Sequence, residues 1–186
     1  MPCGRYGVCY GEMEKHKLEE SIVAAFADVE APPDWALVDS REGSEPAEVE
    51  AIFRGVKDWR NLHVFKMDQD AVLSFLSDEA FKYYIQAFMI HDLKGEIQYN
   101  DVVFHLTYGL QDQSAAEPLN PRRYGSRTLR DVAVYRNSMF SPAQAGAIVE
   151  YLKTKLAAEG PDGFDAPAIR QALDNYWLAR AELSSA

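Results

Sequence analysis

The sequence has little cysteine and no long apolar run. Its 186 residues contain two cysteines, Cys3 and Cys9. A disulfide-rich scaffold or a four-ligand zinc site needs more thiols, so we expect two reduced thiols on a mobile N-terminal segment. The chain also lacks the roughly 18 consecutive apolar residues of a membrane span and the basic-then-apolar start of a secretory signal. We therefore expect a soluble, cytoplasmic protein with no membrane partner.

The common short catalytic motifs are missing as well. The chain has no G-x-S-x-G nucleophile elbow, no H-E-x-x-H pair, no G-x-x-x-x-G-K-[ST] phosphate loop and no G-x-G-x-x-G fingerprint. Each motif supplies a local geometry that its chemistry needs, so their absence removes the usual signatures of several large enzyme classes. The sequence accordingly predicts no cofactor.

Positive charge is scarce, and it is unevenly placed. The net charge is −10. Thirteen acidic residues stand against five basic ones between Glu12 and Asp58, whereas five arginines stand against two acidic residues between Glu117 and Arg136. A general nucleic-acid binder needs net positive charge to neutralise phosphates, so no nucleic-acid partner is expected. The acidic surface is typical of a solvated face or of a site for a basic partner.

What the chain does contain is helix signals. Its length fits one domain, and 47% apolar with 26% charged residues is an ordinary globular mixture. We predict a flexible leader over 1–11 and a single helical domain over 12–182. The fold class is mainly α: an irregular bundle of about five to seven helices with little or no β-sheet. The predicted helices are Met13–Val29, Ser44–Gly55, Ser77–Gly95, Asn100–Gly109, Ser141–Gly160 and Asp165–Arg180. For Asn100–Gly109 a strand is the alternative, because Val102, Val103 and Phe104 also suit one.

The predicted helix Ser77–Gly95 has the strongest pattern. Ser77 can cap its first turn, and Gly95 follows its last. Large apolar side chains recur on one stripe, at Phe81, Tyr84, Ile85 and Phe88. Burying each is worth about 1.5–3 kcal/mol, so we interpret this stripe as the centre of the core and not as a substrate site.

Several short stretches resemble an uncharacterised, mostly bacterial family that is known only as a domain of unknown function. They are Leu37–Gly43, Phe75–Tyr84, Val103–Thr107, Asn120–Gly125 and Asn175–Trp177. The resemblance spreads over roughly residues 20–180 and implies kinship without implying a reaction. The chain departs from the family pattern at Gln86 and Val102, where a proline is expected. Because glutamine keeps the amide that proline lacks, the predicted central helix should run straighter here.

The preferred candidate site is the basic stretch after the fourth predicted helix. Arg122, Arg123 and Arg127 can hold a carboxylate or phosphate through paired guanidinium hydrogen bonds, and Tyr124 offers a ring and a hydroxyl. This stretch lies in a long segment, 111–127, that reads as an irregular loop. The alternative is that the arginines pair with the acidic N-terminal half and only fix the loop in place.

Two further groups are candidates. Asp39 and Glu42 lie in an acidic loop and could move a proton if a pocket raised the pKa of one of them, although a solvated loop is the commoner arrangement. His105 lies between Phe104 and Leu106, where a partly buried ring hydrogen-bonded to a backbone carbonyl is the usual outcome. The four histidines show no paired ligand spacing, so no metal site is predicted.

Three functions remain open on the sequence alone. The leading one is a non-enzymatic binding or regulatory module that holds an unknown protein or a small anionic ligand. The alternative is a small hydrolase or transferase whose anionic substrate is held by the Arg122/Arg123 loop, with His105 or Asp39 moving a proton. The third is a homodimer with exposed Tyr83 or Trp177 as its aromatic anchors.

Overall fold

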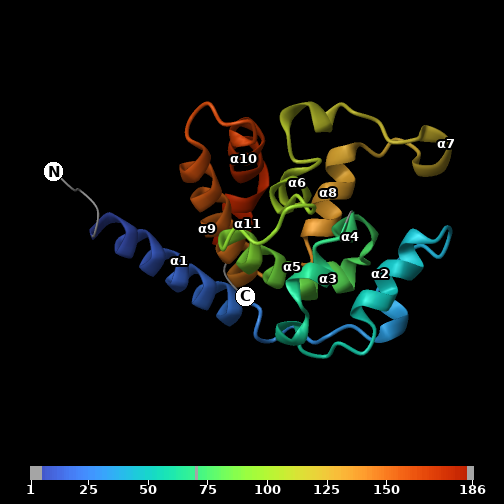
Figure 1. Ribbon diagram of the computed structural model, residues 1–186. Helices are drawn as coiled ribbons and strands as arrows, with labels where there is room; N and C mark the ends of the chain where they lie inside the picture. The colour runs from blue at the N-terminus through green and yellow to red at the C-terminus, as the bar shows by residue number, and fades with distance from the viewer. Residues whose placement is uncertain (1–5, 70, 184–186) are drawn as a thin grey trace.

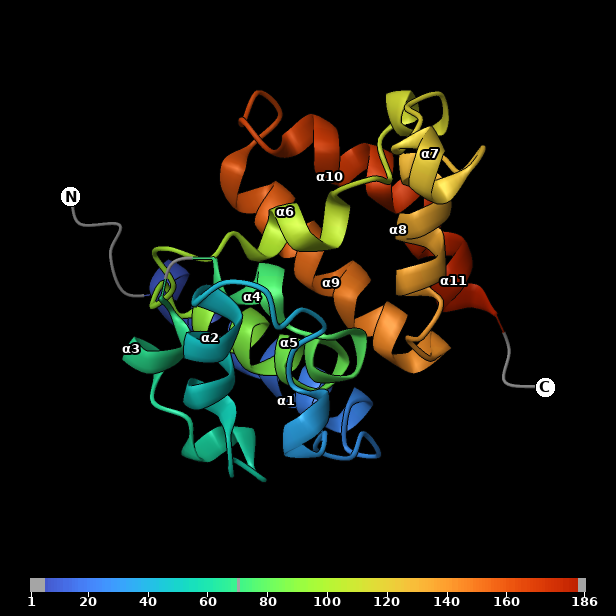
Figure 2. The same cartoon turned by 90° about the vertical axis from the view of Figure 1, so that its right-hand side faces the viewer.

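The computed structural model describes residues 6–69 and 71–183, and these fold into layers of helices (Figures 1 and 2). No strand occurs in these two ranges; two isolated β-bridges, Val38 with Leu76 and Pro118 with Thr128, are the extended pairings. The mainly α-helical class is therefore confirmed. The α-helices are α1 (Tyr6–Ala25), α2 (Glu45–Phe53), α3 (Val64–Met67), α4 (Val72–Phe75), α5 (Asp78–Leu93), α6 (Val102–Thr107), α7 (Pro121–Tyr124), α8 (Leu129–Asn137), α9 (Pro142–Glu159), α10 (Ala166–Ala172) and α11 (Leu178–Glu182).

Helix α5 forms the centre of the core, as its apolar stripe predicts. The Ser77 hydroxyl accepts a hydrogen bond from the Ala80 amide at 3.1 Å and donates one to the Ala36 carbonyl at 2.5 Å, so it caps the helix and ties it to the preceding chain. Phe81, Tyr84 and Phe88 are fully buried. Gln86 is buried too, and its side-chain amide donates to the Tyr83 carbonyl at 2.8 Å. The helix is thus enclosed on nearly every side, and its aromatic residues are used for packing.

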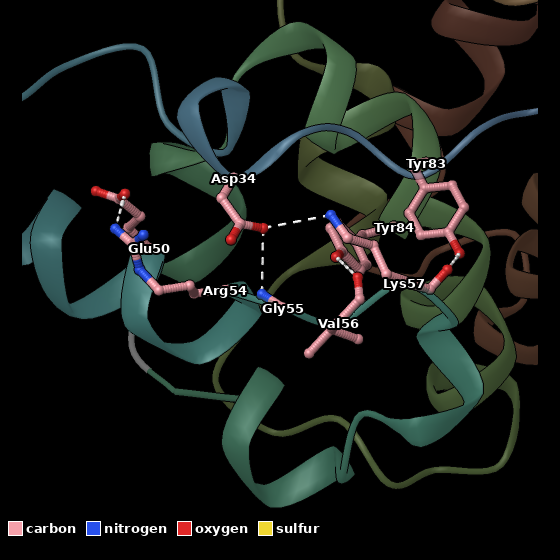
Figure 3. Close-up of polar contacts among 8 residues, drawn as sticks. All are labelled: Asp34, Glu50, Arg54, Gly55, Val56, Lys57, Tyr83 and Tyr84. Atoms are coloured by element: carbon pink, nitrogen blue, oxygen red, sulfur yellow. Dashed lines mark hydrogen bonds and ion pairs between the residues drawn. The ribbon is translucent and has the colours of Figure 1, made fainter.

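The two adjacent tyrosines of α5 fix the segment that follows α2 (Figure 3). Tyr83 donates its hydroxyl hydrogen bond to the Lys57 carbonyl at 2.9 Å, and Tyr84 donates to the Val56 carbonyl at 3.0 Å. On the other side of this segment, the Asp34 carboxylate accepts from the Gly55 amide at 3.2 Å. The segment is held from both sides, which positions α2 against the core.

The dimer anchors expected from the sequence are both buried. Tyr83 is 6% exposed, and its hydroxyl is engaged as described. Trp177 is fully buried and donates its indole hydrogen bond to the Leu106 carbonyl at 2.8 Å. Neither ring can reach a second molecule without unfolding its surroundings, so the expectation that they are exposed is wrong.

Helix boundaries differ from the sequence prediction mainly at the N-terminal side. Helix α1 begins at Tyr6, seven residues before the predicted start, so residues 6–11 of the predicted leader are helical and Cys9 lies on α1. Residues 1–5, including Cys3, lie outside the described residues. Ser44 precedes α2 but its side chain makes no capping hydrogen bond, because the residue is already in the helical region of φ and ψ.

Four helices are absent from the prediction: the short helices α3, α4 and α7, and the longer helix α8. Helix α8 begins after Thr128, whose hydroxyl accepts from the Asp131 amide at 3.2 Å while the Asp131 carboxylate accepts from the Thr128 amide at 2.8 Å. This reciprocal pair is a capping box. Segment 111–127 is also more ordered than an irregular loop: it contains a 3₁₀ turn, Asp112–Ala115, and the short helix α7.

The C-terminal helices α9, α10 and α11 lie together, with α10 and α11 packed against α9 and with α9 packed against α1 (Figure 1). Helix α9 has the predicted capping box, with Ser141 and Gln144 bonded reciprocally at 2.9 and 3.3 Å. Its Tyr151 hydroxyl donates to Asp92 of α5 at 2.6 Å. Between α10 and α11 the chain continues through a π-helical segment, Leu173–Trp177, which contains the family-like stretch Asn175–Trp177. No helix in the described ranges combines the length and apolar character that a bilayer crossing requires.

Candidate functional site

The candidate site is a cleft on the side of the molecule seen in Figure 2, where α7 and α8 lie. We call it the loop cleft. Its volume is about 590 Å³, within the range of small-molecule and side-chain pockets. Its lining combines two rings, one aliphatic side chain and five charged groups: Asp39, Asp78, Tyr124, Arg127, Asp131, Val132, Tyr135 and Arg136.

The wall of the loop cleft that contains Tyr124 and Arg127 is a loop closed by backbone hydrogen bonds. The Leu119 amide donates to the Arg127 carbonyl at 3.1 Å, and the Leu129 amide donates to the Glu117 carbonyl at 2.9 Å. These bonds join the two arms of the loop around α7 at its tip (Figure 1). Gly125 closes the tip with a φ of 66°, a region that favours glycine. The loop therefore presents Tyr124 and Arg127 in a defined position.

The opposite walls come from α8 and from the start of α5. Helical spacing places Asp131, Val132, Tyr135 and Arg136 on one face of α8. Asp78 lies in the first turn of α5, and the Val38–Leu76 bridge brings Asp39 beside it. The loop cleft is thus assembled from three separate parts of the sequence.

Arg136 is the partly buried cation of the cleft. Its Nε lies 3.1 Å from Asp78 Oδ1, and its guanidinium lies 4.0 Å from the centroid of the Phe81 ring. Burial lowers the pKa of Arg136, whereas the neighbouring Asp78 and Asp39 carboxylates raise it. An arginine stays protonated under such opposing influences. The charge of Asp78 is therefore already balanced within the protein.

Asp39 and Arg127 make no such direct contact, although Arg136 attracts Asp39 and Asp131 lies within the electrostatic reach of Arg127. No described side chain forms an ion pair or hydrogen bond with the Asp39 carboxylate or the Arg127 guanidinium. Burial, followed by repulsion from Asp78, raises the pKa of Asp39. Asp131 differs, because its hydrogen bonds with Thr128 lower its pKa. Asp39 and Arg127 are therefore the two charged side chains of the loop cleft whose charged groups form neither an ion pair nor a hydrogen bond with a described residue.

The structure brings together three of the seven residues proposed from the sequence. Asp39, Tyr124 and Arg127 line the loop cleft. Arg122 lies on α7, exposed and outside the lining, and its amide bonds to the Asn120 side chain at 3.1 Å. Arg123 lies on α7, but its side chain is outside the described part of the structure.

Glu42 is exposed in the turn before α2, where its amide donates to Ser40 Oγ at 3.2 Å, and it does not line the cleft.

His105 is also outside the lining of the loop cleft. It lies on α6, with its ring centroid 6.3 Å from that of Phe81 and 5.4 Å from that of Phe104. Burial, together with the positive charge of Arg136, lowers the pKa of His105 to about 4. The imidazole is therefore neutral at pH 7, and no described group forms a hydrogen bond with it.

The other histidines serve local contacts. His63 Nδ1 accepts from the Phe65 amide at 3.2 Å, His91 lies 2.6 Å from Glu96, and His16 lies 3.5 Å from Glu20. Within the described residues, no three His, Cys, Asp or Glu side chains are placed together as metal ligands. In the described residues, the titratable groups therefore lie in separate pairs.

Sequence reasoning missed the α8 side of the cleft. The sequence showed Arg136 and Asp131 only as members of a charged stretch, and no sequence pattern identified Tyr135 as a site residue. The capping pair Thr128 and Asp131, three residues apart, is the pattern that could have revealed α8. Once α8 is recognised, its spacing of residues would have predicted one shared face.

The comparisons with known proteins give a family and no activity. Residues 14–181 match the family described as "Family of unknown function (DUF6714)". No curated protein and no solved structure matches the chain significantly. The match spans most of the chain, in agreement with the family-like stretches of the sequence. The protein therefore belongs to the DUF6714 family, a family of unknown function.

Proposed function

We propose that this protein is a non-enzymatic binding module that holds another protein at the loop cleft. The observation that carries the proposal is the combination, in one cleft, of exposed aromatic surface with two charged groups that form no ion pair or hydrogen bond with a described residue. Tyr135 is 77% exposed, and Tyr124 is 39% exposed. Tyrosine and tryptophan are the residues on which protein–protein binding energy concentrates. The proposal keeps the cytoplasmic location expected from the sequence.

The lining of the cleft favours binding over catalysis. It contains no serine, cysteine or histidine, so it offers neither a usual nucleophile nor a base that operates near pH 7. The enzymatic alternative has His105 or Asp39 as its proton carrier. His105 lies outside the lining, and its pKa of about 4 makes it a weak base, whereas Asp39 lines the cleft and has a raised pKa. The hydrolase or transferase alternative consequently has less support.

Co-purification from the protein's own cells tests the proposal. Tagged wild-type protein and two variants, Tyr135→Ala and Tyr99→Ala, would be isolated and their companions identified by mass spectrometry. Tyr99 is a matched control, because it is 68% exposed and does not line the loop cleft. We expect one companion in near-stoichiometric amount with the wild type and with Tyr99→Ala, and recovery reduced by at least about fivefold with Tyr135→Ala.

Two outcomes would contradict the proposal. Equal recovery of the companion with Tyr135→Ala and with the wild type would remove the cleft from the interaction. A bound anionic metabolite that is lost on Arg123→Ala, without any protein companion, would favour the enzymatic alternative. Size-exclusion chromatography of the purified protein tests the homodimer, which would need anchors other than Tyr83 and Trp177.

A further inference from the structure

We propose that the partner presents an extended basic segment to this face, with an arginine or lysine side chain seated against Asp39. This inference rests on the proposed function and specifies the chemistry of the partner. Three features of the described residues lead to it: a second cleft next to the first, the Asp39 carboxylate without an ion pair or hydrogen bond, and an exposed ring in each of the two clefts that this carboxylate lines.

The second cleft adjoins the loop cleft and shares two residues with it. Its volume is about 360 Å³, and its lining contains Trp35, Ala36, Val38, Asp39, Arg41, Ser77, Asp78 and Glu79. Asp39 and Asp78 belong to both linings. A chain that crosses from one cleft to the other therefore passes directly over Asp39.

The charges at this crossing favour a cation. Asp78 pairs with Arg136 at 3.1 Å, whereas no described side chain forms an ion pair or hydrogen bond with Asp39. The negative charges of Asp78 and Glu79 disfavour ionised Asp39, and the charge of Arg136 offsets part of this repulsion. An arginine or lysine brought by a partner would relieve this repulsion and form a charge-assisted hydrogen bond. The two linings together contain four acidic residues, Asp39, Asp78, Glu79 and Asp131, and three arginines, Arg41, Arg127 and Arg136.

Exposed rings flank the crossing. Trp35, in the second cleft, is 71% exposed, and Tyr135, in the loop cleft, is 77% exposed. A guanidinium or ammonium group is attracted to the face of such a ring. The protein already uses this contact internally, since Arg136 lies over Phe81 at 4.0 Å and Arg60 over Trp59 at 4.6 Å.

An extended segment fits the two clefts better than a helix does. A helix with its side chains is about 10–12 Å wide and binds through an apolar face laid in an apolar groove. The loop cleft has Val132 as its single aliphatic lining residue. Adjoining hollows with charged and aromatic walls suit individual side chains of an extended chain, which alternate from side to side.

Peptide binding to the full-length protein tests the inference. The probe is a fluorescein-labelled peptide, Gly-Gly-Arg-Gly-Gly-Arg-Gly-Gly with blocked ends, measured by fluorescence anisotropy. The control peptide replaces both arginines by citrulline, which is neutral and of similar shape. We expect Asp39→Asn to weaken binding of the arginine peptide at least about tenfold, and the citrulline peptide to bind weakly to every protein.

A matched variant separates the site from the overall charge. Asp162→Asn removes the same single charge from an exposed position outside both clefts, and we expect it to change the affinity less than about twofold. Equal weakening by the two variants would show attraction to net charge alone and overturn the inference. Tighter binding of inorganic phosphate than of the arginine peptide, abolished by Arg127→Gln, would overturn it in favour of an anionic ligand.

Failure of this inference can be distinguished from failure of the proposed function. A companion captured in a Tyr135-dependent way but bound equally by Asp39→Asn would keep the binding module and contradict its basic partner. Recovery of the companion that is unchanged by Tyr135→Ala would contradict the binding module itself. Circular dichroism checks that Asp39→Asn is folded, as we expect because the carboxylate holds no hydrogen bond within the described structure.

Discussion

His105 shows how a single residue can be identified from sequence while its role is not. The sequence indicates a partly buried ring, and the structure places it against Phe81 and Phe104. The backbone carbonyl partner expected for it is absent among the described residues. Its low pKa is caused first by burial and then by the charge of Arg136, a residue far along the chain. Such long-range contacts have no local sequence pattern.

The lowered pKa of His105 predicts a pH-dependent stability. The pKa is about 4 in the folded protein and about 6.5 when unfolded, so the unfolded state binds more protons between these values. The stabilisation is complete above pH 6.5 and is lost as the pH falls towards 4, by roughly 3 kcal/mol in the free energy of unfolding. Urea denaturation of wild type and His105→Gln at pH 7 and pH 4.5 measures it.

The informative quantity is the difference between the stability losses of wild type and His105→Gln, because the carboxylates titrate in both proteins. We expect the wild type to lose more stability than His105→Gln on acidification. His16→Gln, on the exposed side of α1, should behave like the wild type. Identical losses in wild type and His105→Gln would mean that the imidazole is not held neutral by its surroundings.

Among the helices, the prediction succeeds where the sequence signals for both ends of a helix lie in or directly beside that helix. Helices α5 and α9 have a serine cap, a regular apolar stripe and a glycine after the last turn, all within one short stretch. Helix α8 lacks a clear apolar stripe, since Val132, Val134 and Tyr135 are exposed on it. Its order comes from its capping box and from neighbours such as Asp78, which pairs with Arg136.

The turn before α6 shows a second kind of order that no periodic pattern reveals. The Asp68 carboxylate, 8% exposed, accepts from the Gln98, Tyr99 and Asn100 amides at 2.6, 3.0 and 3.1 Å. It also accepts from the Asn100 side-chain amide at 3.1 Å, and Asn100 accepts in turn from the Leu73 amide. One side chain therefore joins the end of α3 to the start of α6.

Removing that carboxylate should destabilise the protein strongly. Asp68→Ala leaves several buried amides without an acceptor, and hydrogen bonds to a charged group are worth about 1.5–3 kcal/mol each, so we expect a loss of at least about 3 kcal/mol. Chemical denaturation measures the loss, with Asp162→Ala as an exposed control. A loss below about 1 kcal/mol would show that water replaces the carboxylate at little cost.

For the whole molecule, charge placement links the fold to the proposed function. The acidic excess and the arginine-rich stretch are both visible in the sequence. Their assembly is not, because Asp39, Asp78 and Arg136 meet only through the Val38–Leu76 bridge and the packing of α8 on α5. The sequence offered the acidic face and the arginine loop as alternatives, whereas the folded chain places members of both in one cleft.

Site-specific photo-crosslinking in the protein's own cells tests the central claim most directly. A benzoyl-phenylalanine at position 135 reports what lies against the loop cleft, and the same residue at position 99 reports an equally exposed surface elsewhere. Both positions hold exposed tyrosines, so the substitution should be tolerated. The account predicts one discrete protein adduct at position 135 and none at position 99. Equal adducts at both positions, or an adduct at position 99 alone, would contradict it.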